Sequence, residues 1–469
     1  MSESNFGFLT PGEQDNLSNK YESFKYKGIP SYFDVNELEM LLDRFLAIDD
    51  AEEVKRLLRL ADKLHPGDIG LKLRKAKHFF SEGKLNKAWS LLNKIEAIEK
   101  SRAEVFLIKG MIQVMNKQFD DADALFEKAV TMAGGEVEDM YYTIATTLET
   151  ASQYKAAIKY FKKAYELSGT DDPELLYDLA FCFEKSGDTD TSNFYYKKYL
   201  DINPFSETGW YNLAVNYHNT DNFEKSHEAF KYALTVTPDY LPAILGNAEN
   251  LMKMGRYEEC IRYYKIYIDK TEPYSGTFTE VGHAYRKLGS YKFAITYYHK
   301  ALEHNNKCAD AHYGLGLIKY NEDKYLESIT HFKTALKHAT YDADYWYSLG
   351  ISYRKLGFSQ KAQDAFERAL DLYPYDPDFW VSYADMAFLT GEVKLAIEVL
   401  TRGEIFNQNT ARIKYRLAAY YLEAENKSNA ISYFSKALRL NANESNDFFT
   451  FYPKAAYLTE LRSLVQKKL

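Results

Sequence analysis

Tyrosines recur along the 469-residue chain at spacings of 34 or 35 residues or a multiple of 34. The recurring set is Tyr142, Tyr177, Tyr211, Tyr313, Tyr347 and Tyr415. A phenol ring combines apolar area with a hydroxyl group, and tyrosine is enriched at protein interfaces. If these tyrosines share one face, they form a ladder of contact groups for a partner protein. The alternative is that a repeating unit simply requires tyrosine at this position.

A basic and apolar patch is a second candidate for partner binding. Residues 55–109 contain 14 Lys and Arg against 6 Asp and Glu. The patch consists of Arg74, Lys77, Leu107, Ile108 and Met111. A basic surface beside an apolar one suits a peptide with acidic and hydrophobic residues. The alternative is that the two cations are merely solvated and that the N-terminal segment covers the three apolar residues.

Residues 117–207 have the opposite charge balance, with 9 basic against 18 acidic residues. Basic partner segments could dock on this stretch, or it could simply form a solvated acidic face. The whole chain has a net charge of -8, which disfavours a nucleic-acid partner.

Patterns for catalysis or metal binding are missing from the sequence. Six of the ten histidines fall within residues 275–342, but they lack the spacing of metal ligands on one helix face. The three cysteines form neither a CxxC pair nor a disulfide framework. No glycine-rich phosphate loop, HExxH motif or GxSxG motif occurs. The sequence therefore predicts no enzyme activity, no cofactor and no metal.

A repeating segment positions all of these residues, and it is clearest at residues 343–376. Numbered from 1, this segment has Trp at 4, Leu at 7, Gly at 8, Tyr at 11, Ala at 20, Phe at 24, Ala at 27 and Pro at 32. Positions 4, 7, 8 and 11 share one stripe of a first helix, and positions 20, 24 and 27 share one stripe of a second helix. One helix pair cannot bury its own apolar seam, so neighbouring pairs must stack.

Twelve units follow this pattern. They start at Val35, Ile69, Ala103, Glu138, Pro173, Glu207, Leu241, Ser275, Ala309, Ala343, Pro377 and Ala411. Position 8 is small in eleven of the twelve units, and position 24 is always aromatic or leucine. Residues 1–34 are predicted to be a tail, disordered over its first 20 residues, followed by an aromatic cap. Residues 445–469 are predicted to be a linker and one capping helix from about Lys454 to Lys468.

The pattern resembles the tetratricopeptide repeat at each of these positions, over residues 35–444. The resemblance implies an all-α fold, a right-handed α-solenoid of about twelve helix-turn-helix repeats with terminal caps. It also implies a concave surface lined by first-helix positions 2, 5, 6, 9, 12 and 13, which include the tyrosines and the patch. Some family members grip chaperone tails with a lysine and asparagine clamp, which this sequence does not match. The ends, with YFDVNELE at residues 32–39, also resemble long cytosolic members of the family from Bacteroidetes.

The sequence-based hypothesis is a non-catalytic scaffold or adaptor that binds peptide or helix segments of other proteins in the concave groove. The alternative is a regulatory receptor whose superhelix changes shape around a small peptide or nucleic-acid ligand. The N-terminus lacks a signal-peptide pattern, and no run of 18 apolar residues occurs. We therefore expect a cytoplasmic protein without membrane insertion. The sequence leaves its oligomeric state and the identity of its partner proteins open.

Overall fold

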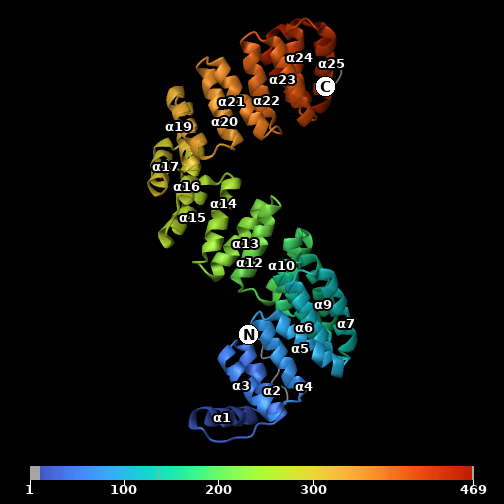
Figure 1. The fold of residues 1–469 in the computed structure, drawn as a ribbon. Helices are drawn as coiled ribbons and strands as arrows, with labels where there is room; N and C mark the ends of the chain where they lie inside the picture. The colour runs from blue at the N-terminus through green and yellow to red at the C-terminus, as the bar shows by residue number, and fades with distance from the viewer. Residues whose placement is uncertain (1–10, 136, 467–469) are drawn as a thin grey trace. The chain divides into compact units, whose positions relative to one another are not determined.

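The computed structural model describes residues 11–135 and 137–466, which form helices and contain no strand. These residues confirm the predicted all-α fold of successive helix pairs (Figure 1). The α-helices are α1 (Pro11–Lys27), α2 (Val35–Ala47), α3 (Ala51–Leu64), α4 (Ile69–Ser81), α5 (Leu85–Ile98), α6 (Ala103–Met115), α7 (Phe119–Met132), α8 (Val137–Thr150), α9 (Tyr154–Ser168), α10 (Pro173–Ser186), α11 (Thr189–Ile202), α12 (Glu207–Asn219), α13 (Phe223–Val236), α14 (Leu241–Lys253), α15 (Tyr257–Lys270), α16 (Ser275–Lys287), α17 (Tyr291–His304), α18 (Ala309–Asn321), α19 (Tyr325–His338), α20 (Ala343–Lys355), α21 (Ser359–Leu372), α22 (Pro377–Leu389), α23 (Val393–Phe406), α24 (Ala411–Glu423), α25 (Lys427–Leu440), α26 (Ser445–Phe451) and α27 (Thr459–Gln466). Two 3-10 helices, η1 (Ala442–Glu444) and η2 (Pro453–Tyr457), lie among the last three α-helices.

The chain divides between Asp221 and Asn222 into two compact units. Unit 1 contains α1 to α12, and unit 2 contains α13 to α27. In both units the first helix of each repeat begins where the sequence pattern starts a repeat, except that α8 begins at Val137 rather than at Glu138. Within each unit a first helix packs against the second helix that follows it, as α6 does with α7 and α18 with α19.

A close approach between position 8 and position 24 joins the two helices in the repeats that have glycine at position 8. A Cβ atom added to Gly350 would lie 2.8 Å from Cε1 of Phe366, and one added to Gly110 would lie 2.4 Å from Cε1 of Phe126. Both phenylalanine rings are fully buried. The small residue at position 8 is therefore required because the ring at position 24 occupies the space where a side chain would go.

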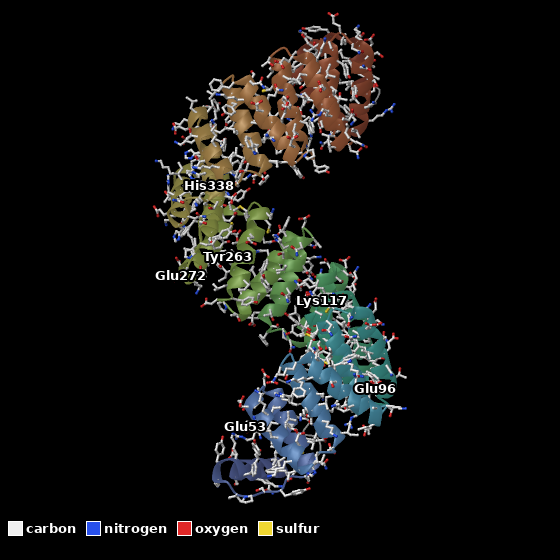
Figure 2. All side chains as sticks on the ribbon, viewed as in Figure 1. Glu53, Glu96, Lys117, Tyr263, Glu272 and His338 are labelled. Carbon is white, nitrogen blue, oxygen red and sulfur yellow. The ribbon has the colours of Figure 1, made fainter. Side chains whose placement is uncertain are left out.

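A left-handed residue at position 15 connects the two helices in all twelve repeats. Glycine supplies it in six repeats, for example Gly357 with φ of 76°. In the other six a non-glycine residue adopts this conformation, for example Lys117 with φ of 61°. Lys117 is labelled in Figure 2. The turn geometry is thus a property of the repeat and is kept even where the sequence lacks the residue that adopts it without strain.

The N-terminal segment corrects one expectation. Residues 11–20, predicted to be disordered, belong to helix α1, and the prediction for residues 1–10 lies outside the described residues. Helix α1 buries Leu17 and Tyr21 against the apolar side chains of α2 and α3. The hydroxyl of Tyr21 donates to Glu53 on α3 at 2.5 Å, and Lys25 pairs with the same carboxylate at 2.7 Å. Glu53 is labelled in Figure 2. This packing orders a segment whose composition alone indicated a tail.

The C-terminal cap also differs from the prediction of one helix from Lys454. After the short η1 at the end of the last repeat, residues 445–466 form α26, η2 and α27, and within the described residues α27 spans only Thr459–Gln466. Pro453 begins η2 and is separated from the end of α26 by one residue. Proline disfavours a helix interior, because it lacks the backbone N–H that a helical hydrogen bond requires. The buried rings of Phe448 and Tyr452 and the buried Leu461 cover the end of the unit 2 core, whereas Tyr457 is 86% exposed.

Substituting Gly350 with valine should destabilise the protein by about 1–3 kcal/mol, because the new side chain overpacks against Phe366. The free energy of unfolding can be measured by urea denaturation followed by circular dichroism. Valine in place of Lys355, which is exposed on the same helix, is the control and should cost much less. Equal losses for the two variants would contradict the packing role of position 8.

Candidate protein-binding surface

The recurring tyrosines connect neighbouring repeats. In four of them the hydroxyl at position 5 bonds to the side chain at position 6 of the next repeat. The pairs are Tyr142 donating to Asp178 (2.8 Å), Asn212 donating to Tyr177 (2.9 Å), Tyr313 with Ser348 (3.1 Å) and Tyr347 with Ser382 (2.9 Å). The rings are half-buried. These phenols therefore hold successive first helices in register and also leave part of each ring exposed.

Tyr415 departs from the predicted ladder because no repeat follows its own. Its side chain is 2% exposed, its hydroxyl donates to the carbonyl of Asn441 at 2.9 Å, and its ring lies against Phe434 and Phe448. The C-terminal cap thus covers it, and Tyr415 offers almost no surface to a partner. Tyr211, on α12, is half-buried, as are the four tyrosines that bond to the next repeat.

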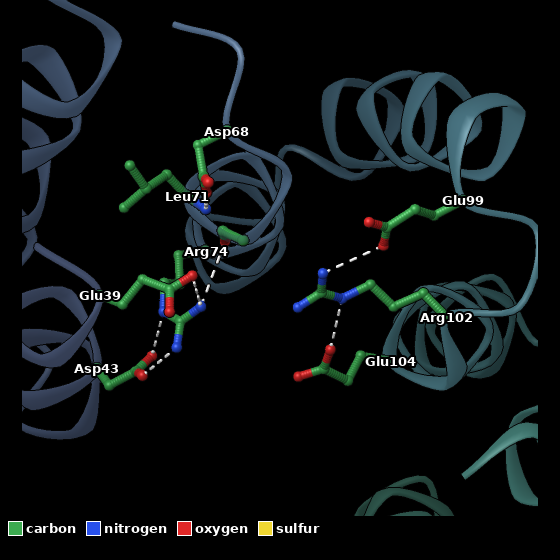
Figure 3. A network of polar contacts seen from close by, with 9 residues as sticks. Glu39, Asp43, Asp68, Leu71, Arg74, Glu99, Arg102 and Glu104 are labelled. Atoms are coloured by element: carbon green, nitrogen blue, oxygen red, sulfur yellow. Dashed lines mark hydrogen bonds and ion pairs between the residues drawn. The ribbon is translucent and has the colours of Figure 1, made fainter. Parts of the chain in front are cut away.

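Arg74, the main cation of the predicted basic patch, is neutralised within the fold. Its guanidinium pairs with Glu39 at 2.7 Å and with Asp43 at 2.6 Å, both on α2 (Figure 3). Arg102 is similarly held by Glu99 and Glu104 (Figure 3). Lys77 is half-buried on α4. Arg74 and Arg102 are therefore engaged in ion pairs within the fold.

The apolar residues of the patch pack partly or wholly into the hydrophobic core. Ile108 is 3% exposed and shares a buried cluster with Leu73, so its predicted exposure is wrong. Leu107 and Met111 are half-buried and pack against a core that extends to α10. Helix α1 belongs to a different cluster, on α2 and α3, so the described part of the N-terminal segment is not what covers them.

A pocket of about 500 Å³ lies in unit 1 where α8, α10 and α12 bring predicted residues together. Its lining consists of Tyr142, Pro173, Glu174, Tyr177, Asp178, Tyr199, Asn203 and Thr208. Two of these residues, Tyr142 and Tyr177, belong to the recurring tyrosines. The sequence-based prediction had not selected Glu174 and Asp178 individually, although the acidic balance of residues 117–207 pointed to this stretch.

The carboxylates of this pocket are not neutralised. The ion pairs of the surrounding helices join Lys159 to Asp123 and Glu127, Lys185 to Glu184 and Lys198 to Asp171. Among the described residues no cation pairs with Glu149, Glu174 or Asp178. Burial raises the pKa of Asp178, and burial together with Asp178 raises the pKa of Glu149 to about 7. Such a surface favours a partner that brings positive charge.

Three histidines of unit 2, His283, His312 and His331, are half-buried in the helix pairs. His283 makes a 2.8 Å hydrogen bond with the hydroxyl of Tyr298, and burial and then Arg286 lower its pKa to about 4. The rings of His312 and His331 lie 6.1 Å apart, and burial lowers the pKa of both. Within residues 11–135 and 137–466, no group of three His, Cys, Asp or Glu side chains is arranged to hold a metal ion. The helices of the same ranges include none that is long and apolar enough to cross a membrane.

Comparison with known families agrees with this geometry. Models described as tetratricopeptide repeat match residues 138–171, 174–206, 208–240, 347–410 and 411–444, and a model described as TPR repeat matches residues 282–323. The chain belongs to the tetratricopeptide repeat superfamily. Proteins of this superfamily generally mediate protein–protein interactions and are typically non-enzymatic. No curated protein matches the chain in sequence.

Several solved structures are similar to this chain. Yeast Tom70 has 17% identity and a TM-score of 0.46, with 92% of this chain and 98% of that chain covered. A tetratricopeptide repeat protein from Parabacteroides merdae has 18% identity and a TM-score of 0.45, with 52% and 97% covered. A chain of the APC/C hetero-tetramer Cut9-Hcn1 has 15% identity and a TM-score of 0.42, with 87% and 94% covered.

The bond between Tyr347 and Ser382 should couple two neighbouring repeats energetically. In a double-mutant cycle of Tyr347→Phe and Ser382→Ala, we expect a coupling energy of about 0.5–1.5 kcal/mol, the net value of a partly buried hydrogen bond. Urea unfolding of the wild type, both single variants and the double variant measures it. Strictly additive losses would show that the two hydroxyl groups do not stabilise the stacking.

Glu149 should make stability depend on pH. Its folded pKa of about 7 lies above the ordinary value of 4.5 for a glutamate, so the folded state binds this proton more tightly than the unfolded chain does. Its contribution is complete below about pH 4.5 and is lost as the pH rises through 7. Replacing Glu149 with glutamine should therefore raise the free energy of unfolding at pH 8 and leave it nearly unchanged at pH 4.5. Replacing the exposed Glu166 with glutamine is the control, and the same pH-independent change in both variants would contradict the prediction.

Proposed function

We propose that the chain is a non-catalytic scaffold or adaptor that holds a basic, extended segment of a partner protein on the first-helix face of its fourth to sixth repeats. The observation that carries this proposal is the pocket lined by Tyr142, Tyr177, Glu174 and Asp178, whose carboxylates have no cation partner among the described residues. The segment's lysine or arginine side chains replace the missing cations, and the exposed parts of the tyrosine rings contact its apolar groups.

The geometry supports an extended segment in particular. Neighbouring first helices present the same positions once per repeat, so a chain crossing them meets an aromatic ring and a polar side chain at each step. Tyr142 and Tyr177 are already fixed by their bonds to Asp178 and Asn212. A partner therefore binds a surface whose side chains lose little further conformational entropy.

Removing the charge of the pocket should remove the partner. The variant Glu174→Gln with Asp178→Asn keeps the shape of both side chains, and the amide oxygen at 178 can still accept from Tyr142. Its matched control, Glu166→Gln with Asp190→Asn, removes the same charge from exposed positions on the second helices α9 and α11. Affinity capture from native lysate with quantitative mass spectrometry compares the wild type and both variants, after circular dichroism shows that all three are folded.

We expect a set of proteins that the wild type and the control capture and that the pocket variant loses by at least about tenfold, which corresponds to about 1.4 kcal/mol. The same proteins should be released as the salt concentration rises, because salt screens exposed charges. If the pocket variant captures the same proteins as the wild type in the same amounts, the acidic pocket is not the binding site.

A further inference from the structure

Position 23, on the second helix of each repeat, carries an aromatic side chain in several repeats. Tyrosine occupies it in five repeats, as Tyr160, Tyr195, Tyr263, Tyr297 and Tyr433. Where position 11 of the same repeat is also aromatic, the two rings stack. The centroid distances are 5.6 Å for Tyr195 with Phe183, 5.5 Å for Tyr297 with Tyr285 and 5.6 Å for Tyr433 with Tyr421. These three repeats thus share a place on the second helix where an aromatic ring stacks against the first helix.

In the tenth repeat no aromatic side chain comes from position 23, because this residue is Ala365. A pocket of about 530 Å³ lies there, and its lining includes Tyr353 at position 11, Trp346 at position 4 and Leu336 on the preceding helix α19. Trp346 is held in place, since its indole nitrogen donates to the carbonyl of Thr340 at 2.8 Å. The tyrosine ring that five other repeats supply from position 23 is therefore missing here, although Tyr353, Trp346 and Leu336 are in place.

The rim of this pocket is basic. Lys333, Lys337 and Lys361 are exposed around it, and Asp364 is the acidic residue of the lining. The ammonium groups of Lys333 and Lys361 lie 5.8 and 5.9 Å from the centroid of Tyr353. Among the described residues none of the three lysines pairs with a carboxylate. Asp364 itself accepts a hydrogen bond from Gln360 at 3.1 Å.

We propose that this pocket binds an acidic segment of a partner protein, which inserts one aromatic side chain into the place left by Ala365. The aromatic ring stacks on Tyr353 as the repeats' own tyrosines stack on position 11, and carboxylates on either side of it pair with the three lysines. The site lies within unit 2 and carries the opposite charge to the acidic pocket of unit 1. It therefore selects a different kind of segment, and it stands whether or not the acidic pocket binds a partner.

A fluorescein-labelled peptide with one phenylalanine between two pairs of glutamates is a direct probe, measured by fluorescence anisotropy. The comparison peptide has alanine in place of the phenylalanine. We expect the phenylalanine peptide to bind the full chain at least tenfold more tightly than the alanine peptide. Ala365→Tyr fills the pocket with the side chain that five other repeats carry at this position, and it should weaken binding at least tenfold.

A charge variant tests the rim without filling the pocket. Lys333→Ala with Lys361→Ala should weaken binding and reduce its dependence on salt, whereas Lys394→Ala with Lys427→Ala removes the same charge from exposed positions outside the lining and should leave binding unchanged. Circular dichroism and thermal unfolding establish that each variant is folded.

Three results would overturn the proposal. The first is equal binding of the phenylalanine and alanine peptides. The second is wild-type affinity in both the Ala365→Tyr and the Lys333→Ala with Lys361→Ala variants. The third is that N-acetylphenylalanine binds as tightly as the peptide, which would assign the pocket to a small anionic aromatic molecule instead of a protein segment.

Discussion

The contact between a small residue at position 8 and a ring at position 24 is the constraint on which the rest of the structure depends. At Gly350 and Gly110 the ring lies so close that even a methyl group would overlap it. This approach sets which face of each helix turns toward the other, because position 8 must lie against the side chain at position 24. Once that face is turned inward, positions 5 and 6 must lie along the stacking surface between repeats.

Stacking then follows a simple rule, in which position 5 of one repeat meets position 6 of the next. The rule accommodates different chemistry at each step: a phenol with a carboxylate at Tyr142 and Asp178, and a carboxylate with a guanidinium at Glu39 and Arg74. Leu73 and Ile108, at the same two positions, share a buried apolar cluster. The ladder of tyrosines is therefore first a device for joining repeats, and only the part of each ring left exposed is available to a partner.

The sequence predicts the fold well where the 34-residue repeat pattern is present and poorly at the two ends, where this pattern is missing. The spacing of positions 8 and 24 indicates the helix pairs because it reports directly on the close contact. The two ends have no period, and α1 is ordered by Tyr21 and Lys25 meeting Glu53, a long-range contact that composition does not reveal. Position 15 shows the same limit, because Lys117 adopts a left-handed conformation that tertiary packing imposes against its own preference.

The sequence predicts which helix positions form the candidate site, but it does not predict which side chains of the same fold those residues contact. Counting residues places Arg74 and Ile108 on the first-helix face, yet only the pairing of position 5 with position 6 explains why one is neutralised and the other buried. When this pairing is applied to the sequence, it separates the side chains that contact a neighbouring repeat from those that remain free to contact a partner protein. The charges left over are the ones that can distinguish partners, since a buried or paired charge contributes little to recognition by a second protein. Two groups of such charges are the carboxylates around Asp178 in unit 1 and the lysines around Ala365 in unit 2, so the chain's overall charge describes neither surface.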